Sequence, residues 1–278
     1  MPRCCGCARK TRRRSRDGSV SPRGRRRIRS PPSRRPRPKP DRGRHRRRVG
    51  LTPPLAGTMA IRPTTWDGVY TEGAWLLTRN LVPGVSVYGE SLPVEAAVEY
   101  RRWDANRSKL AAYLKCGGRR WPFGEQASVL YLGAGSGTTV SHISDVCARG
   151  LITAVEVSSR SFRNLLTLAE RRANLVPVLG DASKPQTYAG RVGSVDVVYQ
   201  DVAQRDQESI FLKNLGMLRS GGTGFLIVKA RSADVTAPPT RVFAAAKEAL
   251  MSSGFSVMDV RSLAPFQTDH AAVVVTKP

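Results

Sequence analysis

Cysteine and histidine are scarce in this chain of 278 residues. Of its five cysteines, three stand within the first seven residues, while Cys116 and Cys147 are isolated. This spacing gives neither a disulfide framework nor a zinc-binding motif, so we expect free thiols and a reducing compartment. After residue 58 the only histidines are His142 and His270, and we therefore expect no metal site. His142 follows a glycine turn on a predicted helix, and we interpret it as structural.

Long apolar runs are also lacking. No stretch approaches the roughly 20 apolar residues that a membrane-spanning helix needs. The N-terminus has no apolar core of the kind found in secretory signals. We therefore expect a soluble protein without a membrane partner.

Acidic residues are almost absent from residues 1–58. This segment contains 21 Lys and Arg against two Asp, so it carries about +19 of the formal net charge of +25. It also holds nine of the nineteen prolines and few large apolar side chains, so burial cannot offset the entropy of ordering and we expect disorder. Two interpretations stay open. The segment is an RNA-binding or nuclear-targeting tail, or it is translated sequence upstream of a true start at Met59.

The remainder has the composition of a folded protein, and we divide it into a small N-terminal domain (residues 59–115) and a larger domain (residues 116–278). Turn-forming X-Gly pairs between short aromatic and β-branched runs predict small antiparallel hairpins over residues 59–90. From Pro93 to Gly118 the period changes, and we predict a helix. The helical spacing is carried by Val94, Ala97, Val98, Leu110 and Tyr113.

Strand-like and helix-like segments alternate after residue 128. This alternation predicts an α/β fold with a parallel sheet covered by helices on both faces. At the C-terminal end, a helical segment precedes two strand-like runs with a short connection, which predicts a final antiparallel strand pair. The predicted parallel strands are residues 128–133, 151–157, 175–179, 195–201 and 223–229, and the final pair is residues 255–263 and 270–278.

A glycine turn in SVLYLGAGSGTT, residues 128–139, indicates a nucleotide-binding site. Gly133, Gly135 and Gly137 allow positive φ and a close approach of the backbone to a ligand, and the N–H groups of the following helix point the same way. The dinucleotide fingerprint would need a glycine at Thr138, and the P-loop lysine is missing. Glu156, near the end of the next strand, can accept both hydroxyls of a ribose, so we predict an adenosine pocket.

Chemically useful side chains follow the predicted strands, where ligands of such sheets bind. Lys229 follows the fifth strand, His270 precedes the last, and Lys109 comes from the preceding helix. Asp201 follows the fourth strand, between these lysines, and could hold them in place. A buried Lys with a lowered pKa beside an adenosine pocket suits methyl transfer to a poor nucleophile such as a ribose hydroxyl, because the hydroxyl must lose its proton as it attacks.

Six segments in order resemble the fibrillarin family of RNA-guided ribose 2′-O-methyltransferases, of the archaeal type without a Gly-Arg tail. The similarity spans about residues 59–278 and none of residues 1–58. The segments are YRRWDANRSKLAAYL, VLYLGAGSGTTVSHISD, TAVEVSSRSFRNLLTLAERRANLVPVLGDA, DVVYQDVAQRDQ, FLIVKARSAD and DHAAVVV.

The resemblance implies a class I methyltransferase Rossmann-like domain, with a mostly parallel seven-stranded sheet, behind a small β-rich N-terminal domain. It implies S-adenosyl-L-methionine as cofactor and a catalytic set at Lys109, Asp201, Lys229 and His270. The cofactor contacts that it implies are Gly133, Thr138, Thr139, Glu156, Val157, Asp181, Ala182, Asp201, Val202, Ala203 and Gln204.

The resemblance further implies partners in a ribonucleoprotein: a box C/D guide RNA, target rRNA or tRNA, a Nop-type scaffold protein and a kink-turn-binding protein similar to a ribosomal protein. The expected location is the cytoplasm of an archaeal-type cell, or the nucleolus of a eukaryote. Two alternatives stay open. One is a guide-independent RNA methyltransferase, and the other is a non-catalytic assembly protein that holds RNA. Retention of all the implied catalytic residues disfavours the second.

Overall fold

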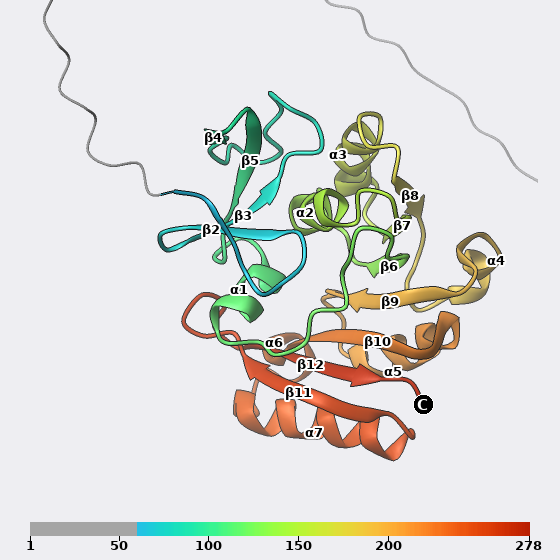
Figure 1. The fold of residues 1–278 in the computed structure, drawn as a ribbon. Helices are drawn as coiled ribbons and strands as arrows, with labels where there is room; N and C mark the ends of the chain where they lie inside the picture. The colour runs from blue at the N-terminus through green and yellow to red at the C-terminus, as the bar shows by residue number, and fades with distance from the viewer. Residues whose placement is uncertain (1–59) are drawn as a thin grey trace, which may run out of the picture. The chain divides into compact units, whose positions relative to one another are not determined.

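A computed structural model of the protein describes residues 60–278. The predictions of disorder, RNA binding or targeting for residues 1–58, and of a start at Met59, lie outside the described residues. The described residues belong to one compact unit. Figure 1 shows its two sheets, a small one built from the first part of the described chain and a larger one that follows.

The small sheet is antiparallel throughout and has the strand order β1-β2-β3-β5-β4. The hairpins predicted for residues 59–90 are confirmed for β1 to β3, whereas the residues between β3 and β4 form no strand. The strands are β1 (Arg62–Pro63), β2 (Val69–Glu72), β3 (Trp75–Arg79), β4 (Val94–Glu95) and β5 (Val98–Trp103).

The helix predicted from Pro93 to Gly118 is wrong over its first half. Glu95 pairs with Val98, so Ala96 and Ala97 form a two-residue hairpin loop between β4 and β5. Their φ angles are +49° and +63°, as a type I′ turn requires at both central positions. Because alanine rarely adopts positive φ, this turn has no signal in the sequence. The spacing of Val94, Ala97 and Val98 fits a helix as well as it fits two short strands.

The second half of that prediction is confirmed as α1 (Lys109–Lys115). Ser108 caps this helix, since its side chain accepts a hydrogen bond from the Ala111 N–H at 3.4 Å. Residues 110–114 are all buried, so the short helix is held by packing on every side rather than by intrinsic propensity.

The large sheet has seven strands in the order β11-β12-β10-β9-β6-β7-β8. Strand β12 is antiparallel to both of its neighbours, and all the other neighbouring strands are parallel. The predicted fold class and the final antiparallel pair are therefore confirmed. The strands are β6 (Val129–Leu132), β7 (Ile152–Glu156), β8 (Leu175–Leu179), β9 (Val195–Gln200), β10 (Leu218–Lys229), β11 (Ser256–Ser262) and β12 (His270–Thr276).

Strand β10 begins earlier than predicted because its pairing with β9 shifts register between Leu218 and Thr223, which adds an irregular first segment.

Helices cover both faces of the sheet (Figure 1), and none within residues 60–278 is both long and apolar enough to cross a bilayer. The helices after α1 are α2 (Thr138–Val146), α3 (Ser159–Ala169), α4 (Ala189–Val192), α5 (Gln207–Asn214), α6 (Ala230–Ala233) and α7 (Pro239–Ser252), with 3₁₀ turns at Pro185–Thr187 and Leu215–Met217.

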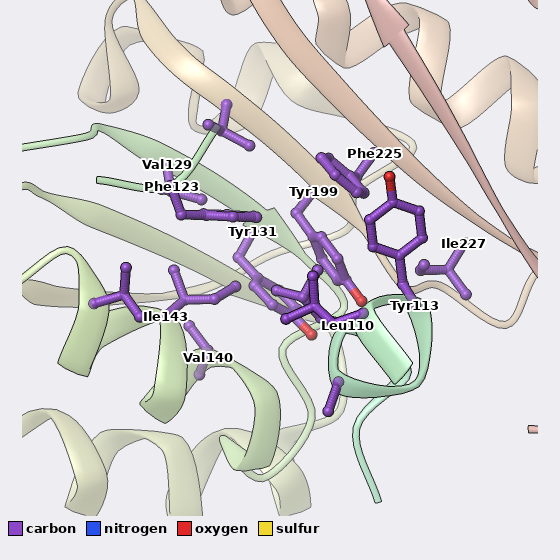
Figure 2. Packing of buried hydrophobic residues seen from close by; sticks show 14 of the residues in the cluster. Leu110, Tyr113, Phe123, Val129, Tyr131, Val140, Ile143, Tyr199, Phe225 and Ile227 are labelled. Atoms are coloured by element: carbon purple, nitrogen blue, oxygen red, sulfur yellow. The ribbon is translucent and has the colours of Figure 1, made fainter. Parts of the chain in front are cut away.

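One hydrophobic core joins the two sheets. It includes Leu76 and Trp103 of the small sheet, the apolar residues of α1, and Phe225 of β10 on the large sheet. Figure 2 shows α1 inserted against the large sheet, with the Tyr113 ring meeting Phe225 edge-on at a centroid distance of 5.3 Å. Helix α1 thus packs on both sheets. The predicted domain boundary at residue 115 stays a prediction.

A buried polar network also joins the two sheets. Asp145 of α2 accepts hydrogen bonds from Arg101 at 2.7 Å, Arg172 at 2.7 Å and the Thr78 hydroxyl at 2.8 Å. His142, which the sequence analysis interprets as structural, is fully buried here and stacks on Trp103 at a centroid distance of 4.8 Å. Each buried polar group in this cluster needs its hydrogen-bond partner. The cluster therefore fixes how the small sheet packs against the large one.

Candidate active site

The turn after β6 brings two strand ends together. Gly133 has a φ of +78°, and a Cβ at this position would lie 2.8 Å from the main-chain oxygen of Asp201. Gly137 has a φ of +102° at the start of α2, where a Cβ would overlap the Leu168 side chain. Only glycine fits at these two places, so the turn can lie against the end of β9 and expose the first N–H groups of α2.

A cavity of about 530 Å³ opens above this turn, at the carboxyl ends of the parallel strands. Glu156 is buried at its wall and accepts hydrogen bonds from Gly135 N and Ser158 N, both at 2.8 Å. These two bonds fix the carboxylate and leave lone pairs on both oxygens for a ligand. The cavity therefore matches a nucleoside whose ribose hydroxyls donate to Glu156.

Most residues predicted to bind the cofactor line this cavity. Asp181 is the exception: its neighbours Gly180 and Ala182 line the cavity, while its own carboxylate accepts a hydrogen bond from Ser183 N at 2.9 Å. That hydrogen bond lowers the pKa of Asp181, so the carboxylate is charged and turned toward its own loop. The predicted residues in the lining are Gly133, Thr138, Thr139, Glu156, Val157, Ala182, Asp201, Val202, Ala203 and Gln204.

Three of the four predicted catalytic residues meet at the rim. Lys109 Nζ donates to Asp201 Oδ2 at 3.0 Å. Lys229 Nζ lies 2.7 Å from Asp201 Oδ1, but its hydrogen bond goes to the main-chain oxygen of Asp201 at 2.9 Å. Asp201 Oδ1 is buried beneath this ammonium group. Both ammonium groups therefore lie against the Asp201 carboxylate and are held in place by its charge, although Oδ1 itself accepts no hydrogen bond.

His270, the fourth, stands opposite Lys229 in the pairing of β10 with β12. Side chains that face each other across two strands lie on the same side of the sheet. His270 Nδ1 lies 2.6 Å from the Thr268 carbonyl oxygen, which can only accept a hydrogen bond, so Nδ1 carries the proton. In the neutral ring, Nε2 is then a bare acceptor.

Partial burial lowers the pKa of His270 and so favours the neutral ring. The hydrogen bond to Thr268 and the charge of Asp201 raise this pKa, whereas the charges of Lys109 and Lys229 lower it. A neutral imidazole beside two ammonium groups can accept a proton at neutral pH.

Sequence reasoning missed Gln207, the first residue of α5. Its Oε1 accepts a hydrogen bond from Lys229 N at 2.9 Å, and its Nε2 donates to Lys229 O at 3.2 Å. The pairing of β10 with β9 ends at Leu226 and Gln200, so Lys229 has no β9 residue beside it. The fully buried Gln207 amide makes the hydrogen bonds that a neighbouring strand would make there. It thereby fixes the main chain from which the Lys229 ammonium extends.

Arg107 is a second residue that the sequence did not single out. It lines the cavity, and Arg107 Nη1 donates to the Tyr88 carbonyl oxygen at 3.0 Å. Its position two residues before Lys109, in a loop, gives no periodic signal. Only the fold places it at the cavity.

The sequence also matches a family model. The model described as Fibrillarin matches residues 61–278, almost all of the described chain. The chain belongs to the fibrillarin family. The motif resemblance is thus confirmed, and the residues that build the cavity and its rim lie within the matched range.

Known fibrillarins are similar to this chain in sequence and in structure. A fibrillarin-like rRNA/tRNA 2′-O-methyltransferase of Methanothermobacter thermautotrophicus is 45% identical over 212 residues, which are 76% of this chain and 95% of the relative. The crystal structure of Aeropyrum pernix fibrillarin with natively bound S-adenosyl-L-methionine has a TM-score of 0.74 and 41% identity, covering 80% of this chain and all of that one. A fibrillarin/Nop5p complex has a TM-score of 0.72 and 38% identity, covering 78% of this chain and 100% of that one.

Proposed function

We propose that this protein transfers the methyl group of S-adenosyl-L-methionine to the 2′-hydroxyl of a ribose in rRNA or tRNA, at sites chosen by a box C/D guide RNA. The observation that carries the proposal is the cluster of Lys109, Asp201, Lys229 and His270 at the rim of a nucleoside-sized cavity. Membership of the fibrillarin family and the relatives named 2′-O-methyltransferases support it.

The residues present fit the cofactor. Glu156 would accept the ribose hydroxyls, the glycine turn leaves room for the ligand beside Asp201, and Val157 and Ala182 would border the adenine. When bound, S-adenosyl-L-methionine supplies an electrophilic methyl group on a sulfonium. The protein's own part is to align the acceptor hydroxyl with that methyl and to exclude water, which accounts for most of the acceleration in such a reaction.

The residues at the rim stabilise the negative charge that develops on the acceptor oxygen and accept its proton. Lys229 stabilises negative charge on the ribose oxygen as its proton leaves, because Asp201 holds the ammonium beside the cavity. We assign the proton to His270 Nε2, which is an acceptor because Thr268 fixes the tautomer, while Asp201 keeps the two ammonium groups in place. The methyl–sulfur bond breaks as the oxygen–methyl bond forms, and His270 later releases the proton to water.

The proposed partners follow from the weak charge of the folded part. Residues 59–278 contain 25 Lys and Arg against 19 acids, an excess too small to hold RNA by itself. We therefore propose that a Nop-type scaffold places the RNA, as the fibrillarin/Nop5p complex of a relative suggests, together with a guide RNA and a kink-turn-binding protein. The enzyme would act where this ribonucleoprotein assembles, in archaeal-type cytoplasm or a nucleolus.

The test uses the protein assembled with guide RNA, scaffold and kink-turn proteins, and tritiated S-adenosyl-L-methionine. Lys229→Ala is compared with Lys213→Ala, an exposed lysine of α5 outside the site. We expect label on one guide-specified ribose, lost by about 100-fold or more in Lys229→Ala but not in Lys213→Ala, with cofactor binding retained. Labelling without guide or partners would favour a guide-independent methyltransferase, and no labelling despite bound cofactor would favour an assembly protein.

A further inference from the structure

A second hollow of about 550 Å³, as large as the cofactor cavity, lies beside it. One wall is the loop between β3 and β4, and the other is the outer side of α3 and the residues that follow it. We call it the α3 groove. It is lined by Val82, Val85, Ser86, Val87, Tyr88, Arg107, Ser136, Thr138, Asn164, Thr167, Leu168, Arg171 and Arg172.

The α3 groove is continuous with the cofactor cavity. Arg107, Ser136 and Thr138 line both hollows. A chain molecule whose reacting group sits at the rim of the cavity can therefore continue into the groove.

The lining of the groove is suited to an anion. No carboxylate borders it among the described residues, whereas Arg107 and Arg171 are exposed there and form no ion pair within residues 60–278. The third arginine, Arg172, is buried and neutralised by Asp145 at 2.7 Å. The remaining lining is valine, leucine, hydroxyl and amide groups, which can contact sugars and bases.

Arg107 is held in position before any ligand binds. Besides the bond from Nη1 to the Tyr88 carbonyl oxygen, its guanidinium lies over the Tyr88 ring, 5.0 Å from the centroid. The other N–H groups of this planar fork are left to bind a ligand. A preorganised guanidinium of this kind matches the geometry of a phosphate and loses little side-chain entropy on binding.

We propose that the α3 groove binds the sugar–phosphate backbone of the RNA strand that carries the target ribose, with Arg107 and Arg171 each on a phosphate. This inference rests on the proposed function, which places the acceptor ribose at the cavity rim. Arg107 would hold the phosphate nearest the cavity and Arg171 one farther along the strand. The groove thus sets which ribose of the strand lies beside Lys229.

Arg171 gives the discriminating variant. Arg107 borders both hollows, so its loss could also affect the carboxylate of the cofactor, but Arg171 borders only the groove. The matched control is Arg163→Ala, which removes an exposed arginine of α3 that lines neither hollow. A further variant, Thr167→Trp, fills the groove without changing its charge.

The assembled complex is assayed with target RNA as the variable substrate. We expect Arg171→Ala and Thr167→Trp to raise the KM for target RNA by about 5-fold or more, and Arg171→Ala to reduce the salt dependence of RNA binding by the equivalent of about one phosphate contact. The KM for cofactor and the rate at saturating RNA should match those of Arg163→Ala. Unchanged RNA kinetics in both groove variants, weakened cofactor binding in Arg171→Ala, or loss of the scaffold protein would each overturn the proposal.

Crosslinking gives a readout that does not need methyl transfer. Target RNA with 4-thiouridine next to the acceptor nucleotide is irradiated in the assembled complex without cofactor. We expect crosslinks to peptides containing residues 82–88 or 164–171, and crosslinks confined to other surfaces would overturn the inference. Groove crosslinks in a complex that fails to methylate RNA would leave the groove assignment standing and contradict the proposed function instead.

Discussion

At the scale of single residues, the Lys229 ammonium depends on a side chain 22 positions away in the sequence. The buried Gln207 amide bonds both the N–H and the C=O of Lys229, which no longer has β9 beside it. Because an ångström of misplacement can slow a reaction by orders of magnitude, we infer that Gln207 is a positioning residue for Lys229.

We predict that Gln207→Ala lowers the single-turnover methylation rate by about 10- to 100-fold while the KM for cofactor stays unchanged. Gln207→Glu should not rescue the rate, since a carboxylate cannot donate to the Lys229 carbonyl. The exposed Gln186→Ala serves as control. A rate that follows only the fraction of folded protein would mean that Gln207 stabilises the fold without positioning the lysine.

Motifs and strand ends locate most of the candidate site from the sequence. Lys229 and Asp201 follow apolar runs, and in a parallel sheet such positions meet at one edge. Gln207 and Arg107 have no such signal, because each acts through hydrogen bonds to main-chain groups that only the fold brings near. Asp181 follows a strand as expected and lies between two residues that line the cavity, so its predicted contact with the cofactor stays a prediction, although one carboxylate oxygen accepts a hydrogen bond from Ser183 N.

At the scale of elements, the hairpin between β4 and β5 was the main feature that the sequence did not predict. Its two-residue loop of alanines at positive φ looks like helix in composition, and only its pairing identifies it. The parallel strands were predictable because continuous apolar runs bounded by turns have few other interpretations.

The hairpin yields a stability prediction. Ala97 is exposed with a φ of +63°, where glycine avoids a steric penalty of about 1 kcal/mol. Ala97→Gly should therefore raise the free energy of unfolding by roughly 0.5 kcal/mol, after the greater freedom of glycine in the unfolded chain is subtracted. Ala245→Gly, in the exposed middle of α7, should lower it by about 1 kcal/mol. Urea denaturation measures both, and a loss of stability in Ala97→Gly would contradict the turn.

His142 is buried where β3, β5 and α2 pack together, and its protonation state affects the stability of the fold. His142 Nδ1 lies 2.8 Å from Thr78 Oγ1, whose proton goes to Asp145, so Nδ1–H donates. His142 Nε2 lies 2.8 Å from the Tyr88 hydroxyl oxygen, which also lies 2.9 Å from the Arg102 carbonyl oxygen. Burial lowers the pKa of His142 well below its usual range, and Arg101 and Arg172 lower it further. The folded protein therefore keeps this ring neutral while the unfolded chain binds a proton below about pH 6.5.

The free energy of unfolding should therefore fall as the pH falls below about 6.5. The proton that His142 binds only in the unfolded chain contributes up to about 1.4 kcal/mol per pH unit to this fall. His142→Gln should be less stable at neutral pH but should lose less stability between pH 6.5 and 5.5 than the unaltered protein. His270, whose pKa is also lowered, contributes to both slopes and cancels in the difference. Equal slopes in urea denaturation would show that His142 is already protonated in the fold.

At the scale of the whole molecule, the shared core of the two sheets predicts one cooperative unfolding transition for residues 60–278. The chain offers two independent probes. All four tryptophans lie between residues 66 and 121, in and around the small sheet, whereas helices α2 to α7 belong to the larger one. Tryptophan fluorescence and helical circular dichroism should give the same midpoint in urea. Separate midpoints would mean that the small sheet unfolds as an independent domain.

The residues at the cavity rim are proposed to methylate a ribose 2′-hydroxyl. The most direct measurement compares two target RNAs in the assembled complex, identical except that one has 2′-deoxyribose at the guided nucleotide. Mass spectrometry of the digested RNA should find one methyl group on the ribose of that nucleotide in the first RNA and none in the second. Equal methylation of the deoxy substrate, or a methyl group found on a base, would contradict 2′-O-methylation by this site.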